Sequence, residues 1–160
     1  MKQEFTSKDT SINKDRLPSI YHLDLHDMTI LDYGCGKYTE KMLEYAKEHN
    51  CKWFGYDKYN QDENVNKTAL NVIADVVVCA NVLNVIKEDE IIFEVVRDCL
   101  NHTKTVAYFS VYEKDGSNQG QETKTDCYQR NQKKKEYIEL LNNNGFNAEL
   151  IKGGYIKVAR

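Results

Sequence analysis

The segment Ile30–Gly36, ILDYGCG, constrains the fold of this chain more than any other segment. A short β-prone run ends directly at two glycines, and apolar residues then recur at helical spacing from Met42 to His49. Glycines allow a tight turn and a close approach of a ligand, and the first N–H groups of a helix are expected to face that ligand unpaired. The segment therefore predicts a strand, a bend and a helix that frame a nucleotide site.

Strand and helix patterns alternate along the rest of the chain. Val76-Val77-Val78 is typical of a strand that is buried on both faces. We expect strands within 51–56, 71–82, 104–112, 146–152 and 155–159, helices at 89–101 and 133–143, and a connector or short helix over 58–69. The alternation predicts one α/β domain with a mostly parallel twisted sheet and helices on both faces. The Gly153-Gly154 turn predicts an antiparallel hairpin at the C-terminal end.

The composition is that of a globular protein of one domain. The chain has 160 residues, of which 41% are hydrophobic and 29% are charged, and its net charge is −3. Five cysteines without CxxC spacing argue against a disulfide framework or a metal site, so we expect no metal. The N-terminus is polar, and no apolar run is long enough to span a membrane. We therefore expect a cytoplasmic protein with no membrane partner, in which residues 1–28 precede a domain at 29–160.

Two carboxylates indicate which nucleotide this site would take. Asp32 lies two residues before the first glycine, where a negative charge would repel a pyrophosphate and attract an ammonium or sulfonium group. Thr39 occupies the place of the third glycine of the dinucleotide fingerprint. Asp57 follows the second strand, 21 residues after Gly36, which is the place of an acid that binds ribose hydroxyls. The pattern favours S-adenosylmethionine over NAD.

These segments resemble the class I S-adenosylmethionine-dependent methyltransferases. ILDYGCG and GYDKYN resemble the first two motifs of that superfamily, and DVVVCANVLNVI resembles its fourth-strand motif. More narrowly, NVLNVI and SVYEKDGSNQGQETKTDCYQRN are similar to a set of small phage and bacterial methyltransferase-like proteins, whose relatives are associated with DNA phosphorothioation loci. The resemblance implies a Rossmann-like methyltransferase domain that binds S-adenosylmethionine and transfers its methyl group to an unidentified acceptor.

The resemblance also implies roles for individual residues. Asp32 would hold the amino group of the cofactor, Asp57 would bind its ribose, and residues 1–28 would close over it. The residues that would lie along the methionine half are Gly34, Cys35, Gly36, Cys79, Ala80 and Asn81.

The chain departs from the family pattern at two places. Only about 17 residues separate Asp57 from the next strand, so the domain is shortened between the second and fourth strands of that fold. The strand whose end normally contacts the adenine is therefore shortened or missing. Leu70 and Asn71 are candidates for the adenine contact by their position alone. The segment Cys79–Val82 also lacks the Asn/Asp-Pro-Pro-aromatic motif of the nucleic-acid amino-methyltransferases, which weakens the prediction of base N-methylation without excluding it.

The polar segment 113–132 follows a strand at the edge of the sheet where ligands bind, and we expect a loop there that covers the acceptor. Four residues are candidates for a catalytic role or a contact with the acceptor: Asn81, Asp115, Glu122 and Asp126. Asn84 is a weaker candidate. The polar loop side chains Gln119, Thr123, Lys124 and Gln129 are weaker candidates still, and each of these residues could instead be a turn or a solvated surface residue.

Three other functions remain open on the sequence. Tyr128 and Arg130 beside Lys133–Lys135 suit a nucleic acid, although nearby acids dilute the charge, so a nucleic-acid partner or an accessory role in nucleic-acid methylation is possible but not favoured. The domain could instead be a non-catalytic S-adenosylmethionine-binding module or partner subunit. An NAD-linked or nucleotide-dependent enzyme is the third alternative.

Overall fold

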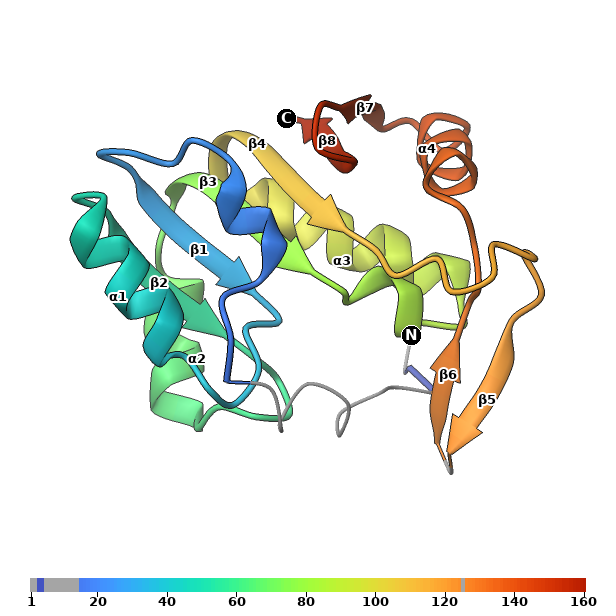
Figure 1. Ribbon diagram of the computed structural model, residues 1–160, viewed down its shortest axis with the longest axis horizontal. Helices are drawn as coiled ribbons and strands as arrows, with labels where there is room; N and C mark the ends of the chain where they lie inside the picture. Colours follow the sequence, from blue (N-terminus) through green and yellow to red (C-terminus); the bar gives the residue numbers. More distant parts are fainter. Residues whose placement is uncertain (1–2, 5–14, 125) are drawn as a thin grey trace.

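A computed structural model describes residues 3–4, 15–124 and 126–160 of the chain. Six strands form one sheet in the order β2-β1-β3-β4-β8-β7, and helices cover both of its faces (Figure 1). Strands β1 to β4 are parallel, β8 pairs antiparallel with β4, and β7 pairs antiparallel with β8 at the edge of the sheet. The predicted α/β domain with a mostly parallel sheet and an antiparallel C-terminal hairpin is therefore confirmed.

The elements follow the predicted alternation of strands and helices closely. In chain order they are η1 (Ser19–His22), β1 (Thr29–Tyr33), α1 (Glu40–Glu48), β2 (Lys52–Tyr56), α2 (Glu63–Leu70), β3 (Ala74–Ala80), η2 (Leu83–Val85), α3 (Asp89–Asn101), β4 (Thr103–Ser110), β5 (Gln121–Lys124), β6 (Cys127–Gln129), α4 (Lys134–Asn142), β7 (Asn147–Ile151) and β8 (Tyr155–Ala159).

The alternating side chains of the strands divide the core between the two faces of the sheet. Val77 and Cys79 of β3 belong to the larger cluster, to which α2, α3 and α4 also contribute. Val76 and Val78 belong to a second cluster with α1 and η1. Both clusters are buried, which explains why β3 is a continuous apolar run rather than an alternating one.

The sheet is short on the side of β2. The chain passes from β2 through α2 directly to β3, which pairs with β1, so β2 has no strand on its outer side among the described residues. The expected shortening between the second and fourth strands of the methyltransferase fold is therefore confirmed. Residues 63–70 form a complete helix, because the Asp62 side chain accepts a hydrogen bond from Val65 N at 2.9 Å and caps its first turn.

The segment 113–132 contains a small hairpin, so the expectation of an unstructured loop is wrong. Strands β5 and β6 pair antiparallel and form a separate two-stranded sheet. Its base is closed by Asn131, whose backbone oxygen accepts from Asn118 N at 2.8 Å and whose side chain donates to Gln119 O at 2.8 Å. Sequence patterns missed this hairpin because Gln121–Lys124 is exposed along its whole length and has no apolar alternation.

Candidate functional site

One pocket of about 1480 Å³ runs along the carboxyl ends of β1, β2, β3 and β4. This is the edge at which ligands bind in open α/β sheets. The volume exceeds the roughly 300–1,000 Å³ of a typical small-molecule site. The pocket is therefore larger than one ordinary small-molecule ligand needs.

The bend after β1 is the floor of the pocket at one end. Gly34 and Gly36 have φ angles of +82° and +77°, which suit glycine. A Cβ at Gly34 would lie 2.4 Å from the Val82 side chain, so the bend and the end of β3 are packed too closely for any other residue. Gly34 and Cys35 line the pocket, whereas Gly36 lies just outside it.

The N–H groups of the bend are already paired, which differs from the sequence-based expectation. Gly34 N and Cys35 N donate to Tyr56 O at 2.7 and 3.0 Å. Gly36 N donates to Oδ2 of Asp57 at 2.8 Å. The bend therefore presents none of these three donors to an anion, and a pyrophosphate would find no cradle of backbone N–H groups there.

Asp57 is buried at the end of β2, with 7% of its surface exposed, and its carboxylate holds the neighbouring loops together. Oδ1 accepts hydrogen bonds from Tyr59 N and from both nitrogens of Asn60, at 3.0 to 3.1 Å. Oδ2 accepts only from Gly36 among the described residues, so it can accept a further hydrogen bond, and Asp57 lines the pocket. Of the two oxygens, Oδ2 is thus the one that can accept from a ligand hydroxyl.

Asp32 brings a buried carboxyl group to the pocket, with 1% of its surface exposed. Oδ2 accepts a hydrogen bond of 2.5 Å from the Tyr21 hydroxyl, which in turn accepts from Trp53 Nε1 at 2.7 Å. Burial raises the pKa of Asp32 to about 7, although the bond from Tyr21 opposes this change. No ion pair with Asp32 occurs within the part of the chain that the structure describes, so a cationic ligand would supply the charge that this site lacks.

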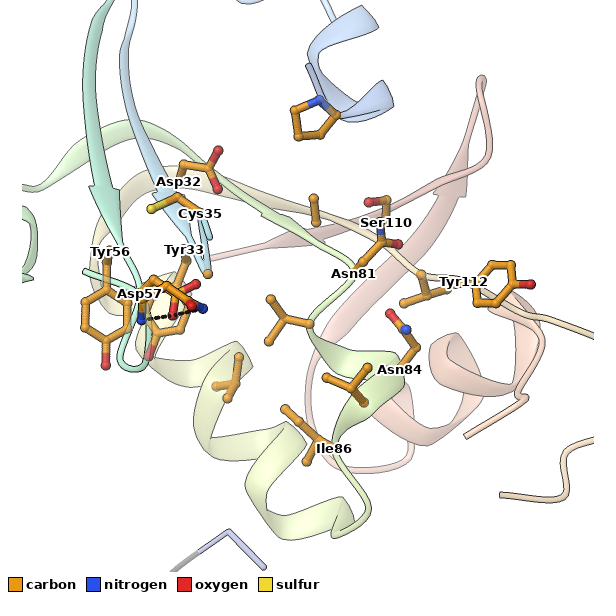
Figure 2. Close-up of a pocket in the computed structure, with 18 of the residues that line it drawn as sticks. Asp32, Tyr33, Cys35, Tyr56, Asp57, Asn81, Asn84, Ile86, Ser110 and Tyr112 are labelled. Atoms are coloured by element: carbon orange, nitrogen blue, oxygen red, sulfur yellow. Dashed lines mark hydrogen bonds between the residues drawn. The ribbon is translucent and has the colours of Figure 1, made fainter. Parts of the chain in front are cut away.

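The end of β3 forms the middle of the pocket. Ala80 and Asn81 line it, whereas the side chain of Cys79 packs in the larger core cluster. Asn81 has a φ of +58° and its N–H donates to Ser110 O at 2.8 Å, which fixes the turn after the strand. Figure 2 shows Asn81 and Ser110 side by side between the end at Asp57 and the end at Tyr112.

The hairpin β5–β6 lies against the other end of the pocket through η2. Arg130 N donates to Asn84 O at 2.9 Å, and Asn84 Nδ2 donates to Gln129 Oε1 at 3.2 Å. Gln129 Nε2 then donates to Tyr112 O at 3.0 Å. Asn84, Tyr112 and Gln129 all line the pocket, although the sequence pattern made Asn84 only a weak candidate and did not single out Tyr112.

The acidic candidates of this segment do not reach the pocket. Asp115, Glu122 and Asp126 are exposed, and none of the three is among the lining residues. Asp115 instead accepts from Ser117 N at 3.0 Å, and this bond lowers its pKa. Thr123 and Lys124 line the pocket, while Gln119 does not.

The basic cluster is partly used for structure. The Arg130 guanidinium donates to Asp89 Oδ1 at 2.6 Å and to the backbone oxygens of Ile86 and Lys87 at 2.9 and 3.0 Å. Only 12% of the Arg130 side chain is exposed, so it anchors the hairpin rather than presenting its charge to a phosphate. Tyr128 and Lys134 line the pocket.

The described part of the N-terminal segment borders the same pocket. Leu17, Ser19 and His22 are among the lining residues, and Ser19 O accepts a 2.6 Å hydrogen bond from the Tyr155 hydroxyl. This bond attaches η1 to β8, and Tyr21 of η1 reaches Asp32. The expected closure by residues 1–2 and 5–14 lies outside the described residues.

The adenine candidates by position, Leu70 and Asn71, lie away from the pocket. They stand between the end of α2 and the beginning of β3, and Leu70 O accepts from His102 Nε2 at 3.0 Å beside the beginning of β4. The carboxyl ends of these parallel strands lie at the opposite edge of the sheet. The pocket is instead lined near Asp57 by Tyr33, Tyr56 and Val82.

Within the described ranges 3–4, 15–124 and 126–160, no three His, Cys, Asp or Glu side chains are grouped so that they could hold a metal ion. No helix in the same ranges has the length and apolar character needed to cross a membrane. All five cysteines are free thiols.

Comparison with solved structures identifies the architecture. A 1,6-didemethyltoxoflavin-N1-methyltransferase from Burkholderia thailandensis, crystallised with S-adenosylhomocysteine, matches with a TM-score of 0.58 at 16% identity, over 88% of this chain and 73% of its own. The magnesium protoporphyrin IX methyltransferase of Synechocystis PCC 6803, crystallised with S-adenosylmethionine, matches with a TM-score of 0.52 at 14% identity, over 89% of this chain and 74% of its own. The chain has the Rossmann-like methyltransferase fold. No protein-family model and no curated protein sequence matches it.

The pocket lies where this fold brings the glycine bend and Asp57 together. The strand–glycine–helix segment and Asp57 lie at the carboxyl ends of adjacent parallel strands, as the sequence predicted. Of the eight predicted cofactor-binding residues, six line the pocket: Asp32, Gly34, Cys35, Asp57, Ala80 and Asn81.

Proposed function

We propose that this protein is an S-adenosylmethionine-dependent methyltransferase. The observation that carries the proposal is the pairing of a buried, uncompensated carboxyl group, Asp32, with a glycine bend whose N–H groups are already used. The Asp32 carboxyl group attracts a cation, and the bend offers no free backbone N–H group to a phosphate. S-adenosylmethionine carries a sulfonium and an ammonium group, and the fold is one in which this cofactor is bound in other proteins.

The chain's own residues would orient the cofactor along the pocket. Asp32 would face the ammonium group, and the Oδ2 atom of Asp57 would accept one ribose hydroxyl. The bend at Gly34 and Cys35 would lie along the methionine half, and Asn81 would stand near the sulfonium. The described residues 15–28 would cover the cofactor from the side of Tyr21.

Methyl transfer needs alignment more than acid or base chemistry. The acceptor atom attacks the methyl carbon with its electron pair, the carbon–sulfur bond breaks, and its electrons remain on sulfur as a neutral thioether. The part of the pocket beyond Asn81 and Ser110 has the space for such an acceptor. The five free thiols suit a reducing compartment, so we propose a cytoplasmic location. Kinship with the small phage and bacterial proteins is supported by the NVLNVI and SVYEKD segments alone.

Calorimetric titration with S-adenosylmethionine, S-adenosylhomocysteine and NAD tests the cofactor assignment. We expect heat from the two sulfur nucleosides and none from NAD. A Leu150→Ala variant should bind the same ligands as the wild type, because Leu150 lies exposed on β7 at the edge of the sheet and does not line the pocket. Binding of NAD alone would overturn the proposal.

A non-catalytic S-adenosylmethionine-binding module is the second candidate function. It is favoured by one observation, namely that Asp115, Glu122 and Asp126 are exposed away from the pocket and bring no general base to it. The two functions differ in turnover, because a methyltransferase releases S-adenosylhomocysteine when its acceptor is supplied. Formation of that product above the rate of an Asp57→Ala control identifies an enzyme, whereas binding without product for every acceptor class identifies a module.

A further inference from the structure

Beyond Asn81, the wall of the pocket contains one buried polar atom that the fold leaves unused. Asn84 is 3% exposed, and its Oδ1 has no hydrogen-bond partner among the described residues. Figure 2 shows the Asn84 side chain below Asn81 and beside Tyr112, at the end of the pocket away from Asp57. Most buried polar side-chain atoms in proteins are paired, so this oxygen requires an explanation.

The hydrogen-bond chain through Gln129 determines which atom of Asn84 is unpaired. The backbone oxygen of Tyr112 can only accept, so the atom of Gln129 that bonds to it must be the donor Nε2. Oε1 of Gln129 then faces Asn84 and accepts from Nδ2. The remaining atom of the Asn84 amide is therefore an acceptor that needs an N–H or O–H donor.

An aromatic residue, Tyr112, lines the same end of the pocket as this acceptor, and Gln129 is hydrogen-bonded to both residues. Tyr112 lines the pocket with 58% of its surface exposed, which is unusual for so large an apolar side chain at a pocket wall. An exposed tyrosine face stacks on planar heterocycles. A planar ring held on Tyr112 can present an edge N–H to Asn84, and this combination selects flat, hydrogen-bond-donating ligands.

The charge of the pocket changes between its two ends. Its acidic lining residues lie on β1, on α3 or directly after β2: Asp32, Asp57, Glu94 and Asp98. Among the described residues outside 110–134, three basic ones also line the pocket: Arg16, Lys58 and Arg97. The described lining residues of 110–134 include three lysines, Lys114, Lys124 and Lys134, and no acid. The end at Tyr112 therefore favours an anion, whereas the rest of the pocket carries charges of both signs and favours a cation only beside the buried Asp32 carboxyl group.

We propose that the methyl acceptor is a nucleotide, that is, a planar nitrogen heterocycle with an N–H donor and an attached phosphate. Its ring stacks on Tyr112, its N–H donates to Asn84 Oδ1, and its phosphate lies among the three lysines. Oδ1 is shielded from solvent in this conformation, so a neighbouring side chain must move before the donor reaches it. This inference rests on the proposed function, because it names the substrate of the same site.

The step balances without a further reactant. The amino nitrogen of the heterocycle forms a bond to the methyl carbon, the carbon–sulfur bond breaks with its electrons kept by sulfur, and one proton leaves the nitrogen to water. The neutral Asn84 amide orients the nitrogen through its N–H and takes no proton itself. Asn84 is thus a residue that binds the acceptor, and Gln129 is a positioning residue that holds the Asn84 amide.

Calorimetric titration of the protein saturated with S-adenosylhomocysteine tests the proposal. The probes are adenosine and cytidine 5′-monophosphates, N6,N6-dimethyladenosine 5′-monophosphate, which lacks the amino N–H, and ribose 5-phosphate, which lacks the ring. We expect one amino nucleotide to bind at least about tenfold more tightly than the dimethylated or ringless probe, because a site built for an N–H donor rejects analogues without it. Single-stranded oligonucleotides show whether the acceptor nucleotide is free or part of a nucleic acid. If only the oligonucleotides bind, the acceptor belongs to a nucleic acid, whereas binding of the mononucleotide indicates a free metabolite.

Variants separate the contributions of ring and amide. Tyr112→Ala should weaken the bound nucleotide about tenfold and Tyr112→Phe should not, because stacking needs the ring and not the hydroxyl. Asn84→Ala should bind the amino nucleotide and the dimethylated probe with similar affinity. If Asn84→Ala does not fold, the comparison of Tyr112→Ala with Tyr112→Phe still tests the proposal. If no mononucleotide or oligonucleotide binds while S-adenosylhomocysteine still does, this inference is overturned and the proposed function stands. If S-adenosylhomocysteine itself does not bind, the proposed function fails.

Discussion

The two ends of the pocket are built by different means. At the end near Asp57, the site lies where parallel strands finish, so the topology of the sheet brings its residues together. At the end near Tyr112, a hairpin with an exposed first strand is held by a few hydrogen bonds from Asn84 and Gln129. Backbone topology therefore fixes the end near Asp57, whereas individual side chains fix the end near Tyr112.

The largest effect is expected from Asp57→Ala. The change leaves the buried Gly36 N and the donors of Asn60 without an acceptor, and each unpaired buried donor costs about 1–3 kcal/mol. Affinity for S-adenosylhomocysteine should fall by about 100-fold or more, measured by calorimetry, because a hydrogen-bonding site loses both its acceptor and its loop geometry. The control is Asp62→Ala, which removes only the cap of α2, lowers stability by about 1 kcal/mol and leaves the affinity unchanged. Equal losses in both variants would mean that Asp57 is only structural.

A second large effect is expected from Gly34→Ala, with Gly145→Ala as its matched control. Both glycines have positive φ angles, +82° and +87°, so both substitutions strain the backbone by about 1–2 kcal/mol. Only the Cβ at Gly34 meets a neighbour, at 2.4 Å from Val82, whereas the Cβ at Gly145 meets nothing within 4 Å. Thermal unfolding should show a larger decrease in Tm for Gly34→Ala, and only this variant should lose ligand affinity. An unchanged affinity would remove the bend from the site.

The pH dependence of Asp32 gives a smaller and more specific effect. Because its folded pKa is about 7 and its unfolded pKa is near 4, the folded protein retains a proton that the unfolded chain releases between these values. The stability that this group contributes is thus complete below about pH 4 and is lost as the pH rises to 7, at about 1.4 kcal/mol per pH unit in between. Urea unfolding of wild type and Asp32→Asn across this range should show that difference in slope. Parallel slopes would place the Asp32 pKa in the normal range.

The ligand affinity should respond to pH in the opposite sense. A cationic ligand pairs with the ionised carboxylate, so its affinity should rise through pH 7 in the wild type and stay flat in Asp32→Asn. S-adenosylhomocysteine, which keeps the ammonium group and lacks the sulfonium, separates the two charges. An affinity that is independent of pH in the wild type would contradict the role of Asp32.

Replacing residues 119–130 by two glycines should have the smallest effect on the cofactor. Asn118 and Asn131 are already joined by a 2.8 Å backbone hydrogen bond, so the shortened connection can close. The affinity for S-adenosylhomocysteine should change by less than about threefold, below 1 kcal/mol, because the hairpin lies at the other end of the pocket. A loss comparable to that of Asp57→Ala would show that the two ends are one unit.

The end of the pocket near Asp57 could largely be predicted from the sequence, whereas the end near Tyr112 could not. The ILDYGCG segment and Asp57 were informative because a strand, a bend and an acid at a fixed spacing have few structural solutions. The pairing of the bend N–H groups with Tyr56 O could not be predicted, because it depends on the register between β1 and β2. The hydrogen bond between Asn84 and Gln129 could not be predicted either, because the two residues are 45 positions apart and the hairpin of Gln129 has no apolar pattern.

A crystal structure with S-adenosylhomocysteine tests the central claim most directly. We predict that the amino group of the ligand lies against Asp32, that a ribose hydroxyl donates to Oδ2 of Asp57, and that the thioether points past Asn81 toward Tyr112. A nucleoside bound elsewhere, or one whose amino group faces away from Asp32, would contradict the account.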